Sequence, residues 1–185
     1  MDFQPGKAGG FLVETKGTPL VLIPLGGKYG KDQHGARRYA LIDLVDYPLV
    51  KDRVWRAHRA RPDQQFHAES GHCNERLHRL LLGLGTRDGR SLQADHKNLL
   101  PLDNRRANIR LATPQENKQN QSLRRDNQCG IKGVGKDRGR WRARIRDRSG
   151  QLLSLGTFAS PDAARQAYDE AARSLHGQFA RPNCP

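Results

Sequence analysis

The stretch Ser91–Asn117, SLQADHKNLLPLDNRRANIRLATPQEN, decides how this chain is expected to fold. Its first six residues and Ile109–Ala112 alternate enough to predict two strands, and the polar residues between them, Lys97–Asn108, predict a loop. Thr113 then predicts the start of a helix, because it can cap the helix while Glu116 completes a capping box and a proline occupies the first helical position. The stretch therefore predicts a ββα unit.

Four polar side chains stand at the junctions of this unit. Asp95 and His96 end the first strand, Asn108 closes the loop and Asn117 lies in the first helical turn. A ββα hairpin brings these ends together, so that the Asp95 carboxylate and the Asn117 amide oxygen can hold a hard cation such as Mg²⁺. Neighbours on a strand point to opposite faces, which leaves His96 to act as a general base near neutral pH. The layout predicts a one-metal site for phosphodiester hydrolysis.

Each of these residues alone has a simpler explanation. An Asp-His pair on a strand is more often an ordinary hydrogen-bonded pair, and asparagine-rich loops usually just make turns. The joint pattern and its spacing favour the nuclease interpretation. Of the other histidines, His78 is the only runner-up, and the rest are interpreted as surface or packing residues.

A second pattern, RWRARIR at Arg140–Arg146, alternates between arginine and apolar residues. On a strand the arginines share one face and the apolar residues the other. Like charges side by side repel, so the array predicts an anionic partner such as phosphate or the edge of guanine. Strands are also predicted at Gly133–Lys136 and Leu152–Phe158, and a helix from Ser160 to Gly177. The pattern predicts a three-stranded antiparallel sheet backed by one helix.

The formal net charge of +14 predicts a polyanionic partner, and double-stranded DNA is the first candidate. No obligate protein partner is inferred. No apolar run is long enough to span a membrane, and the first ten residues lack the features of a signal peptide. We therefore expect no membrane association and a cytoplasmic location in a prokaryotic or phage-infected cell. The three cysteines have no CxxC spacing, so no structural zinc site is expected.

The central stretch resembles a known family. DHKN at 95–98, LDNRRANIR at 102–110 and TPQEN at 113–117 are similar to the HNH endonucleases of homing type. Those enzymes have a ββα-metal fold and are often encoded by phages and mobile introns. The resemblance implies an HNH endonuclease, a phosphodiester hydrolase that uses a divalent metal ion, Mg²⁺ first and Mn²⁺ second.

The resemblance also implies a role for each junction residue. Asp95 and Asn117 would bind the metal, His96 would be the general base, and Asn108 would pin the loop and orient His96 through hydrogen bonds. The family usually has a glycine in the turn after the histidine, where this chain has Leu99-Leu100.

Residues 130–185 resemble the DNA-binding domain of plant ethylene-response factors, the Apetala type, abbreviated ERF here. The match includes GRWRARIRD at 139–147, LGTF at 155–158 and AYDEAA at 167–172. The resemblance implies that the sheet enters the major groove of DNA. Candidate DNA-binding residues are Lys132, Lys136, Arg138, Arg140, Arg142, Arg144 and Arg146.

The base preference of this domain should differ from that of the plant proteins. Leu152 and Ser154 stand on the third strand, where plant members carry large arginine or tryptophan residues.

The expected fold class is α+β: a ββα-metal HNH nuclease module followed by a small domain of a three-stranded antiparallel sheet packed on one helix. In the N-terminal region, strands are expected at Leu20–Ile23 and Tyr39–Ile42, and a loop at Asp63–Cys73. The predicted domains are an N-terminal β-rich region packing on the nuclease module at 1–75, the HNH motif at 76–122, a linker at 123–129 and the ERF-type domain at 130–185.

The leading function is a metal-dependent, site-preferring DNA endonuclease of homing type with an attached DNA-binding sheet. The alternative is a sequence-specific DNA-binding transcriptional regulator whose HNH motif is inactive because of the Leu99-Leu100 turn. RNA binding is a weaker third interpretation, since the sheet is expected to lack exposed aromatic residues for base stacking.

Overall fold

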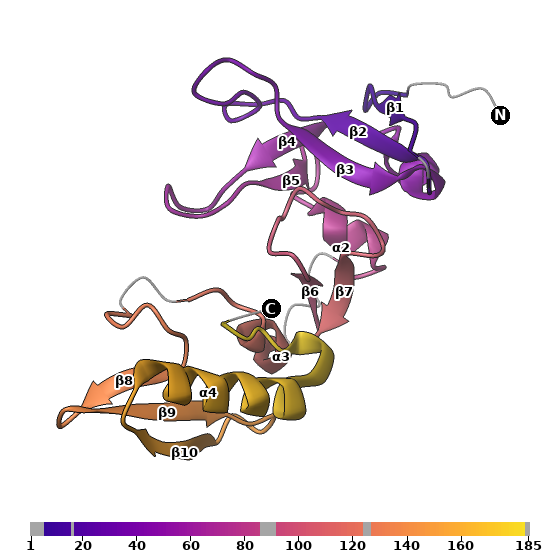
Figure 1. Ribbon diagram of the computed structural model, residues 1–185. Coiled ribbons are helices and arrows are strands. Elements are labelled where there is room, and N and C mark those ends of the chain that lie inside the picture. The colour runs from indigo at the N-terminus through magenta and orange to yellow at the C-terminus, as the bar shows by residue number, and fades with distance from the viewer. Residues whose placement is uncertain (1–5, 16, 86–91, 124–126, 184–185) are drawn as a thin grey trace. The chain divides into compact units, whose positions relative to one another are not determined.

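The computed structural model describes residues 6–15, 17–85, 92–123 and 127–183. Ser91 and Cys184 lie outside these ranges. The chain divides into two compact units, unit 1 at Met1–Leu111 and unit 2 at Ala112–Pro185. Both contain helices and antiparallel strands (Figure 1), so the predicted α+β class is confirmed.

Unit 1 begins with an antiparallel sheet whose order is β1-β2-β3. Its strands are β1 (Phe11–Val13), β2 (Leu20–Pro24) and β3 (Tyr39–Asp43). Alternate residues of β2 and β3 face the core and are fully buried, as a strand period of two requires. The strands predicted from the apolar runs at Leu20 and Tyr39 are confirmed.

The next elements complete the core of unit 1. They are η1 (Leu44–Asp46), α1 (Tyr47–Val50), β4 (Trp55–His58), β5 (His67–Ser70) and α2 (Leu77–Leu81). Trp55 is buried, and its indole nitrogen donates to the Val50 carbonyl at 3.1 Å.

The prediction of a loop over Asp63–Cys73 is wrong at its centre, where β5 pairs with β4. The strand escapes detection because its inward-facing residues, Ala68 and Ser70, are small or polar rather than large and apolar.

The predicted hairpin is present. Strands β6 (Gln93–His96) and β7 (Ile109–Ala112) form a two-stranded sheet, and the residues between them make a loop. The loop is bonded to β3: the Asn104 amide donates to the Leu41 carbonyl at 2.7 Å, and the Leu41 amide donates to the Leu102 carbonyl at 2.8 Å. These bonds fix the loop against the core of unit 1.

Unit 2 begins with the predicted capped helix, α3 (Pro114–Gln119). The Thr113 hydroxyl accepts from the Glu116 amide at 3.2 Å, and the Glu116 carboxylate accepts from the Thr113 amide at 2.8 Å. The capping box is therefore confirmed.

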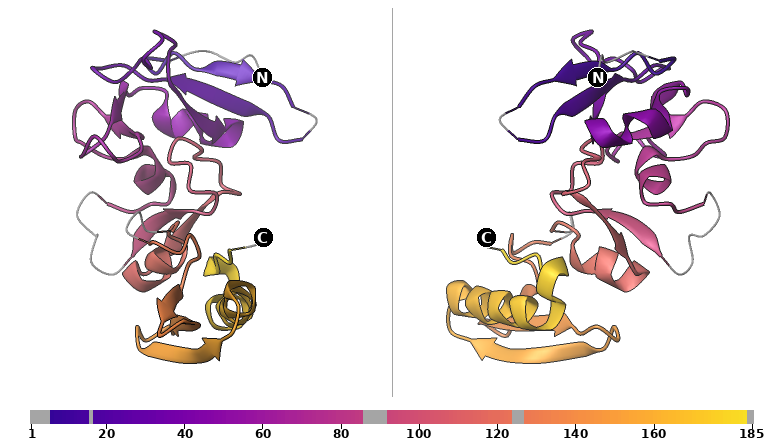
Figure 2. Two further views of the ribbon diagram at one scale, coloured as in Figure 1. Left: turned by 60° about the vertical axis from the view of Figure 1, so that its left-hand side comes forward. Right: turned by 90° about the vertical axis from the view of Figure 1, so that its right-hand side faces the viewer.

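An antiparallel sheet of order β10-β9-β8 follows, with one helix on it (Figure 2). The elements are β8 (Val134–Asp137), β9 (Arg140–Arg146), β10 (Leu152–Phe158), α4 (Pro161–His176) and η2 (Gly177–Phe179). The helix buries Ala164, Tyr168 and Ala172 against the sheet. The predicted sheet backed by one helix is confirmed.

Gly133 shows how closely α4 approaches the sheet. Its φ is +76°, and a Cβ atom at this position would lie 2.1 Å from Cδ2 of Tyr168. Only glycine fits both the backbone conformation and the space. Across the described residues, no helix combines the length and apolar character that crossing a bilayer requires.

Candidate functional site

Asp95 and His96 close β6 and are both buried, with exposures of 3% and 7%. The Asp95 carboxylate is paired with Arg110 of the neighbouring strand β7. Both Nε and Nη2 of Arg110 lie 2.7 Å from Asp95 Oδ2. Arg110, for which no role was predicted from the sequence, fixes the orientation of this carboxylate.

The His96 imidazole is held by Asn104, which is completely buried. Nε2 of His96 lies 3.2 Å from Oδ1 of Asn104. An amide oxygen can only accept, so Nε2 carries the proton of the neutral ring and Nδ1 carries the lone pair. The arrangement therefore assigns Nδ1 as the basic nitrogen. Sequence reasoning missed Asn104, because no local pattern separates it from its polar neighbours.

Burial lowers the pKa of His96 below its ordinary value of 6.5. The hydrogen bond to Asn104 and the carboxylates of Asp95 and Asp103 act in the opposite direction but do not offset the loss of solvation. His96 is consequently neutral at pH 7, the state that a general base needs.

Two further histidine rings continue from His96 through edge-to-face contacts. The His78 ring is perpendicular to the His96 ring, with centroids 5.0 Å apart, and His67 meets His78 at 5.6 Å. Burial lowers the pKa of His78 to about 2 and that of His67 to about 4, and nearby positive charge adds to both effects. His78, the runner-up histidine of the sequence analysis, thus contacts the candidate base as a neutral ring.

Asn108 pins the loop between β6 and β7. Its Oδ1 accepts from the Asn98 amide at 3.0 Å, and its Nδ2 donates to the Asp103 carbonyl at 2.7 Å. It is Asn104 whose side-chain oxygen accepts a hydrogen bond from the His96 ring.

The turn after His96 forms despite the absence of glycine. Leu99 has a φ of +62°, the left-handed conformation that glycine adopts without steric cost, and its amide donates to the His96 carbonyl at 3.0 Å. Asn98 supports the turn, because its side-chain oxygen accepts from the Leu100 amide at 2.9 Å. The chain therefore keeps a glycine-type turn at the cost of backbone strain.

The predicted metal ligands lie in different compact units. Asp95 is in unit 1, while Asn117 is in the first turn of α3 in unit 2, where its amide donates to the Thr113 carbonyl at 3.0 Å. Among the described residues, no group of three or more His, Cys, Asp or Glu side chains is arranged to hold a metal. A single carboxylate suits an ion that takes hard oxygen ligands and keeps most of its waters, as Mg²⁺ does, rather than a closed zinc site.

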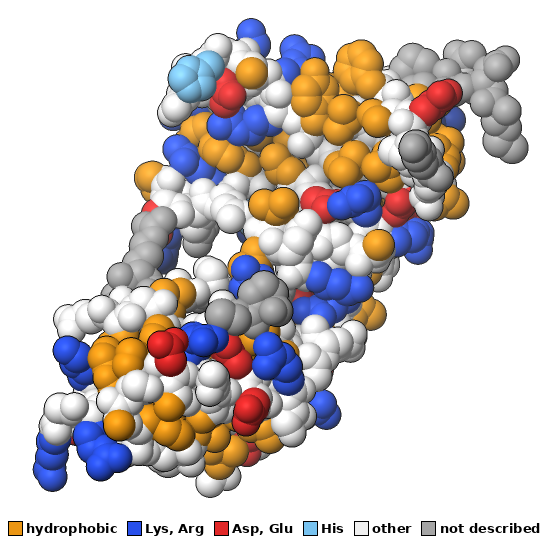
Figure 3. Space-filling model, in the orientation of Figure 1, with side chains coloured by type: hydrophobic (Ala, Val, Ile, Leu, Met, Phe, Trp, Pro, Cys, Tyr) orange, Lys and Arg blue, Asp and Glu red, His pale blue; other side chains and the backbone are white. Residues whose placement is uncertain are grey.

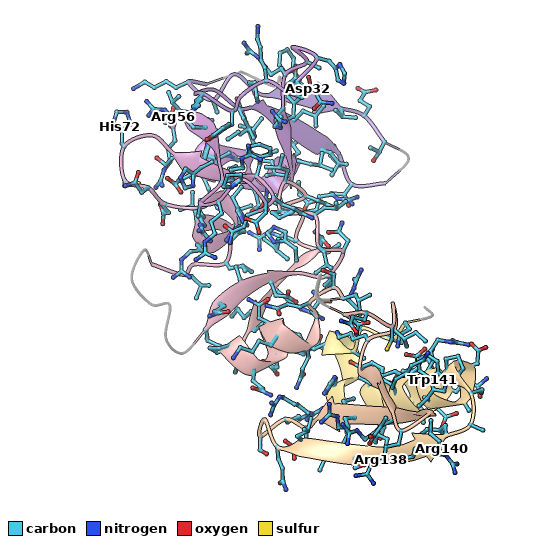
Figure 4. All side chains as sticks on the ribbon, turned by 90° about the vertical axis from the view of Figure 1, so that its left-hand side faces the viewer. Asp32, Arg56, His72, Arg138, Arg140 and Trp141 are labelled. Carbon is cyan, nitrogen blue, oxygen red and sulfur yellow. The ribbon has the colours of Figure 1, made fainter. Side chains whose placement is uncertain are left out.

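Strand β9 presents its arginines as the alternation predicts. Arg140, Arg144 and Arg146 are exposed, and Arg142 is partly exposed beside Asp137 at 3.1 Å. In Figure 4, Trp141 lies toward the helix, while Arg138 and Arg140 lie toward the outside. One face of the sheet is therefore strongly cationic.

The two candidate lysines are placed differently. Lys136 pairs with Trp141 across the sheet, and its Nζ lies 5.3 Å from that ring, so it shares the face opposite the arginines. Lys132 donates from Nζ to the carbonyls of Gln119 and Gln121 at 2.8 Å each, and burial lowers its pKa to about 8. Lys132 thus ties the end of α3 to the sheet domain.

The third strand places two small or apolar residues beside the arginines. Leu152 pairs with Arg146, and Ser154 pairs with Arg144. Both side chains are exposed on the arginine face, where they stand next to whatever that face binds.

Comparisons with known proteins match both regions. An uncharacterized HNH endonuclease of Acanthamoeba polyphaga mimivirus is 24% identical over 152 residues, which are 80% of this chain and 76% of the viral protein. Dehydration-responsive element-binding protein 2C of Arabidopsis thaliana is 49% identical over 59 residues, 31% of this chain. Ethylene-responsive transcription factor ERF084 of the same plant is 52% identical over 46 residues, 24% of this chain.

This chain spans only 17% and 18% of the length of these two plant proteins. No protein-family model and no solved structure matches it. The chain is thus distantly similar to an HNH endonuclease over most of its length, and a part of it is similar to plant proteins of the ERF type.

Proposed function

We propose that the protein is a metal-dependent, site-preferring DNA endonuclease of homing type that acts in the cytoplasm of a prokaryotic or phage-infected cell. The observation that carries the proposal is the His96 imidazole. It is neutral, oriented by Asn104 and adjacent to the buried Asp95 carboxylate, in a chain homologous to an HNH endonuclease.

His96 would act through Nδ1. This nitrogen accepts a proton from the water that attacks the phosphorus, while Nε2 keeps its hydrogen bond to Asn104. The carboxylate of Asp95 and the amide oxygen of Asn117 would hold a divalent cation, Mg²⁺ first and Mn²⁺ second. When bound, that ion neutralises charge on the phosphate and on the departing 3′ oxygen. Asn108 keeps the intervening loop in place.

The ERF-type sheet would supply affinity and register by entering the major groove of double-stranded DNA. Arg140, Arg142, Arg144 and Arg146 lie on the face that would meet the bases and phosphates, and Arg138 lies on the adjoining turn. Leu152 and Ser154 would set a base preference different from that of the plant proteins. Affinity should fall steeply with salt, since each phosphate contact releases counterions.

Of the residues in the implied DNA-binding set, Lys132 and Lys136 are weaker candidates for the groove. One is bonded to α3 and the other shares the face of Trp141. We propose that they support the sheet domain and contact phosphates only at its margin.

A plasmid assay tests the proposal. Supercoiled DNA is incubated with the protein and Mg²⁺ or Mn²⁺, with EDTA as the blank. We expect nicking or cleavage by the wild type, none with EDTA, and none by His96→Ala. His72→Ala is the matched control, because His72 is an exposed histidine of the same unit (Figure 4).

The same assay distinguishes the proposed endonuclease from the alternative, a DNA-binding regulator with an inactive motif. That alternative is favoured by the strained Leu99 turn. If the wild type and His96→Ala both bind DNA and neither cuts it with either metal, the protein is a DNA-binding regulator with an inactive motif.

A further inference from the structure

Two loops of unit 1 meet at one end of its sheets, on the left in Figure 1. One connects β2 to β3 and the other connects β4 to β5. Their contact is aromatic: the rings of Tyr29 and Phe66 lie 5.5 Å apart. The contact joins residues far apart in the sequence and ties the two loops together where the second one enters β5.

Cationic side chains cover these two rings. The guanidinium carbon of Arg38 lies 4.2 Å from the Phe66 centroid, and that of Arg59 lies 4.8 Å from Phe66 and 5.1 Å from Tyr29. Nζ of Lys28 lies 5.5 Å from the Tyr29 centroid. We call Lys28, Tyr29, Lys31, Arg38, Arg59 and Phe66 the arginine–aromatic cluster. Contact with ring faces holds the guanidinium groups in place without neutralising their charge.

The hydrogen bonds of the two arginines leave most of their donors unused. Arg38 donates through Nη1 to the Tyr29 and Lys31 carbonyls, and Arg59 donates through Nη1 to the Pro62 carbonyl at 2.7 Å. Each guanidinium has five N–H donors. Nε of Arg59 is buried with no acceptor in the described part of the chain. The cluster is thus rich in donors that lack acceptors.

Carboxylates do not compensate this charge. Within the residues that the structure describes, no acidic side chain is ion-paired with any of the four cations of the cluster. Asp32 borders the cluster, but its carboxylate accepts from the amides of His34 and Ala36 at 2.8 and 2.9 Å and so stabilises its own loop. A hollow of about 440 Å³ opens between the loops. Figure 3 shows basic side chains beside hydrophobic ones at this end of unit 1.

We propose that the arginine–aromatic cluster is a second DNA-binding surface, which contacts the phosphates of double-stranded DNA separately from the ERF-type sheet. The inference rests on the proposed function only in taking DNA as the partner. Guanidinium groups that lie over rings can still offer paired N–H donors to phosphate oxygens. The rings are already covered by cations, so base stacking is disfavoured and duplex backbone is the fitting ligand.

The test measures DNA affinity of the full chain in EDTA, so that the result does not depend on cleavage. A short fluorescein-labelled duplex is titrated by anisotropy between about 50 and 200 mM salt. The variants are Arg38→Gln with Arg59→Gln, and Lys28→Gln with Lys31→Gln. The second pair leaves the guanidinium–ring contacts in place and guards against misfolding. Lys7→Gln with Lys51→Gln removes the same charge elsewhere in unit 1 and is the control.

We expect each cluster variant to bind more weakly than the wild type, most of all at low salt. Removing two phosphate contacts should reduce the slope of log affinity against log salt by about 1.8, so the loss of affinity should be about tenfold larger at 50 mM than at 200 mM salt. The control should keep the wild-type slope. Equal slopes for the wild type, both cluster variants and the control would overturn the proposal. So would loss of affinity for single-stranded DNA alone, which would indicate a base-stacking site instead.

Discussion

Strand β9 and the segment from Asp95 to Asn108 are held in place by different kinds of contact. The arginine strand depends on its neighbours β8 and β10 and on the helix behind it. The nuclease segment depends on distant residues: Arg106 is paired with the fully buried Asp46 at 2.6 Å, and the Asn104 amide bonds to the Leu41 carbonyl. A binding face can therefore be predicted from local alternation, whereas the site's chemistry depends on long-range polar contacts.

The largest effect should come from disturbing the packing of unit 2. Gly133→Ala would place a methyl group inside the Tyr168 ring and force a positive φ on alanine, costing about 3 kcal/mol of unfolding free energy. Gly135→Ala is the control, since a Cβ atom added there would have nothing within 4 Å. Urea unfolding followed by Trp141 fluorescence in a Trp55→Phe background measures the stability of both variants. Equal stability of the two variants would refute the close helix–sheet contact.

The long-range polar contacts of the nuclease segment can be tested at Asn104. Asn104→Ala removes the partner of His96 Nε2, so cleavage should fall about 30-fold, equivalent to about 2 kcal/mol, while DNA binding persists. Asn104→Asp keeps an acceptor and adds negative charge, which raises the pKa of His96. It should retain cleavage, with the acidic limb of the pH–rate profile moved to higher pH. Unchanged kinetics in both variants would show that Asn104 does not orient the base.

Acid should destabilise unit 1 before unit 2. The folded pKa values of His78 and His67, about 2 and about 4, lie below the ordinary 6.5. The unfolded chain therefore binds protons that the folded chain excludes. The stability that the two neutral rings contribute to unit 1 is present above pH 6.5 and is lost as the pH falls below it. His78 alone should lower the unfolding free energy of unit 1 by about 2 kcal/mol as the pH falls from 6.5 to about 5.

Each unit contains one tryptophan, so the two can be followed separately. Trp55 fluorescence in a Trp141→Phe background reports unit 1, and Trp141 in a Trp55→Phe background reports unit 2. His78→Phe should flatten the acid dependence of unit 1, and His72→Phe should not. The same acid slope with and without His78 would contradict its assignment as a buried neutral ring.

The smallest effect is expected at the turn after His96. Leu99→Gly relieves a positive φ and should raise the unfolding free energy by about 0.5 to 1 kcal/mol, since glycine's greater freedom in the unfolded chain offsets part of the gain. Leu100→Gly, where no positive φ is recorded, should destabilise instead. Thermal unfolding compares the two. A loss of stability in Leu99→Gly would mean that the leucine side chain contributes more than its backbone strain costs.

The sequence predicts the fold best where residue types repeat with the period of a strand or a helix, or match a known capping motif. The alternation of β9, the capping box at Thr113 and the helix that starts after Ser160 all appear as expected. Strand β5 escapes prediction because its buried face carries Ala68 and Ser70, which give no hydrophobic signal.

Within the candidate site, residue types could be predicted but several partners could not. The pairing of Asp95 with Arg110 and of His96 with Asn104 depends on strand register and loop shape, which spacing alone does not determine. The placement of Lys136 beside Trp141 likewise follows from the register of β8 with β9. The roles of Asp95, His96, Asn108 and Asn117 in catalysis remain predictions.

The most direct measurement compares cleavage and binding in two variants of the full chain. We predict that His96→Ala binds the duplex as the wild type does but leaves plasmid intact. Arg142→Gln with Arg144→Gln should bind more weakly, with a shallower salt dependence, yet still cut at high protein concentration. Plasmid cleavage by His96→Ala at the wild-type rate would contradict the account.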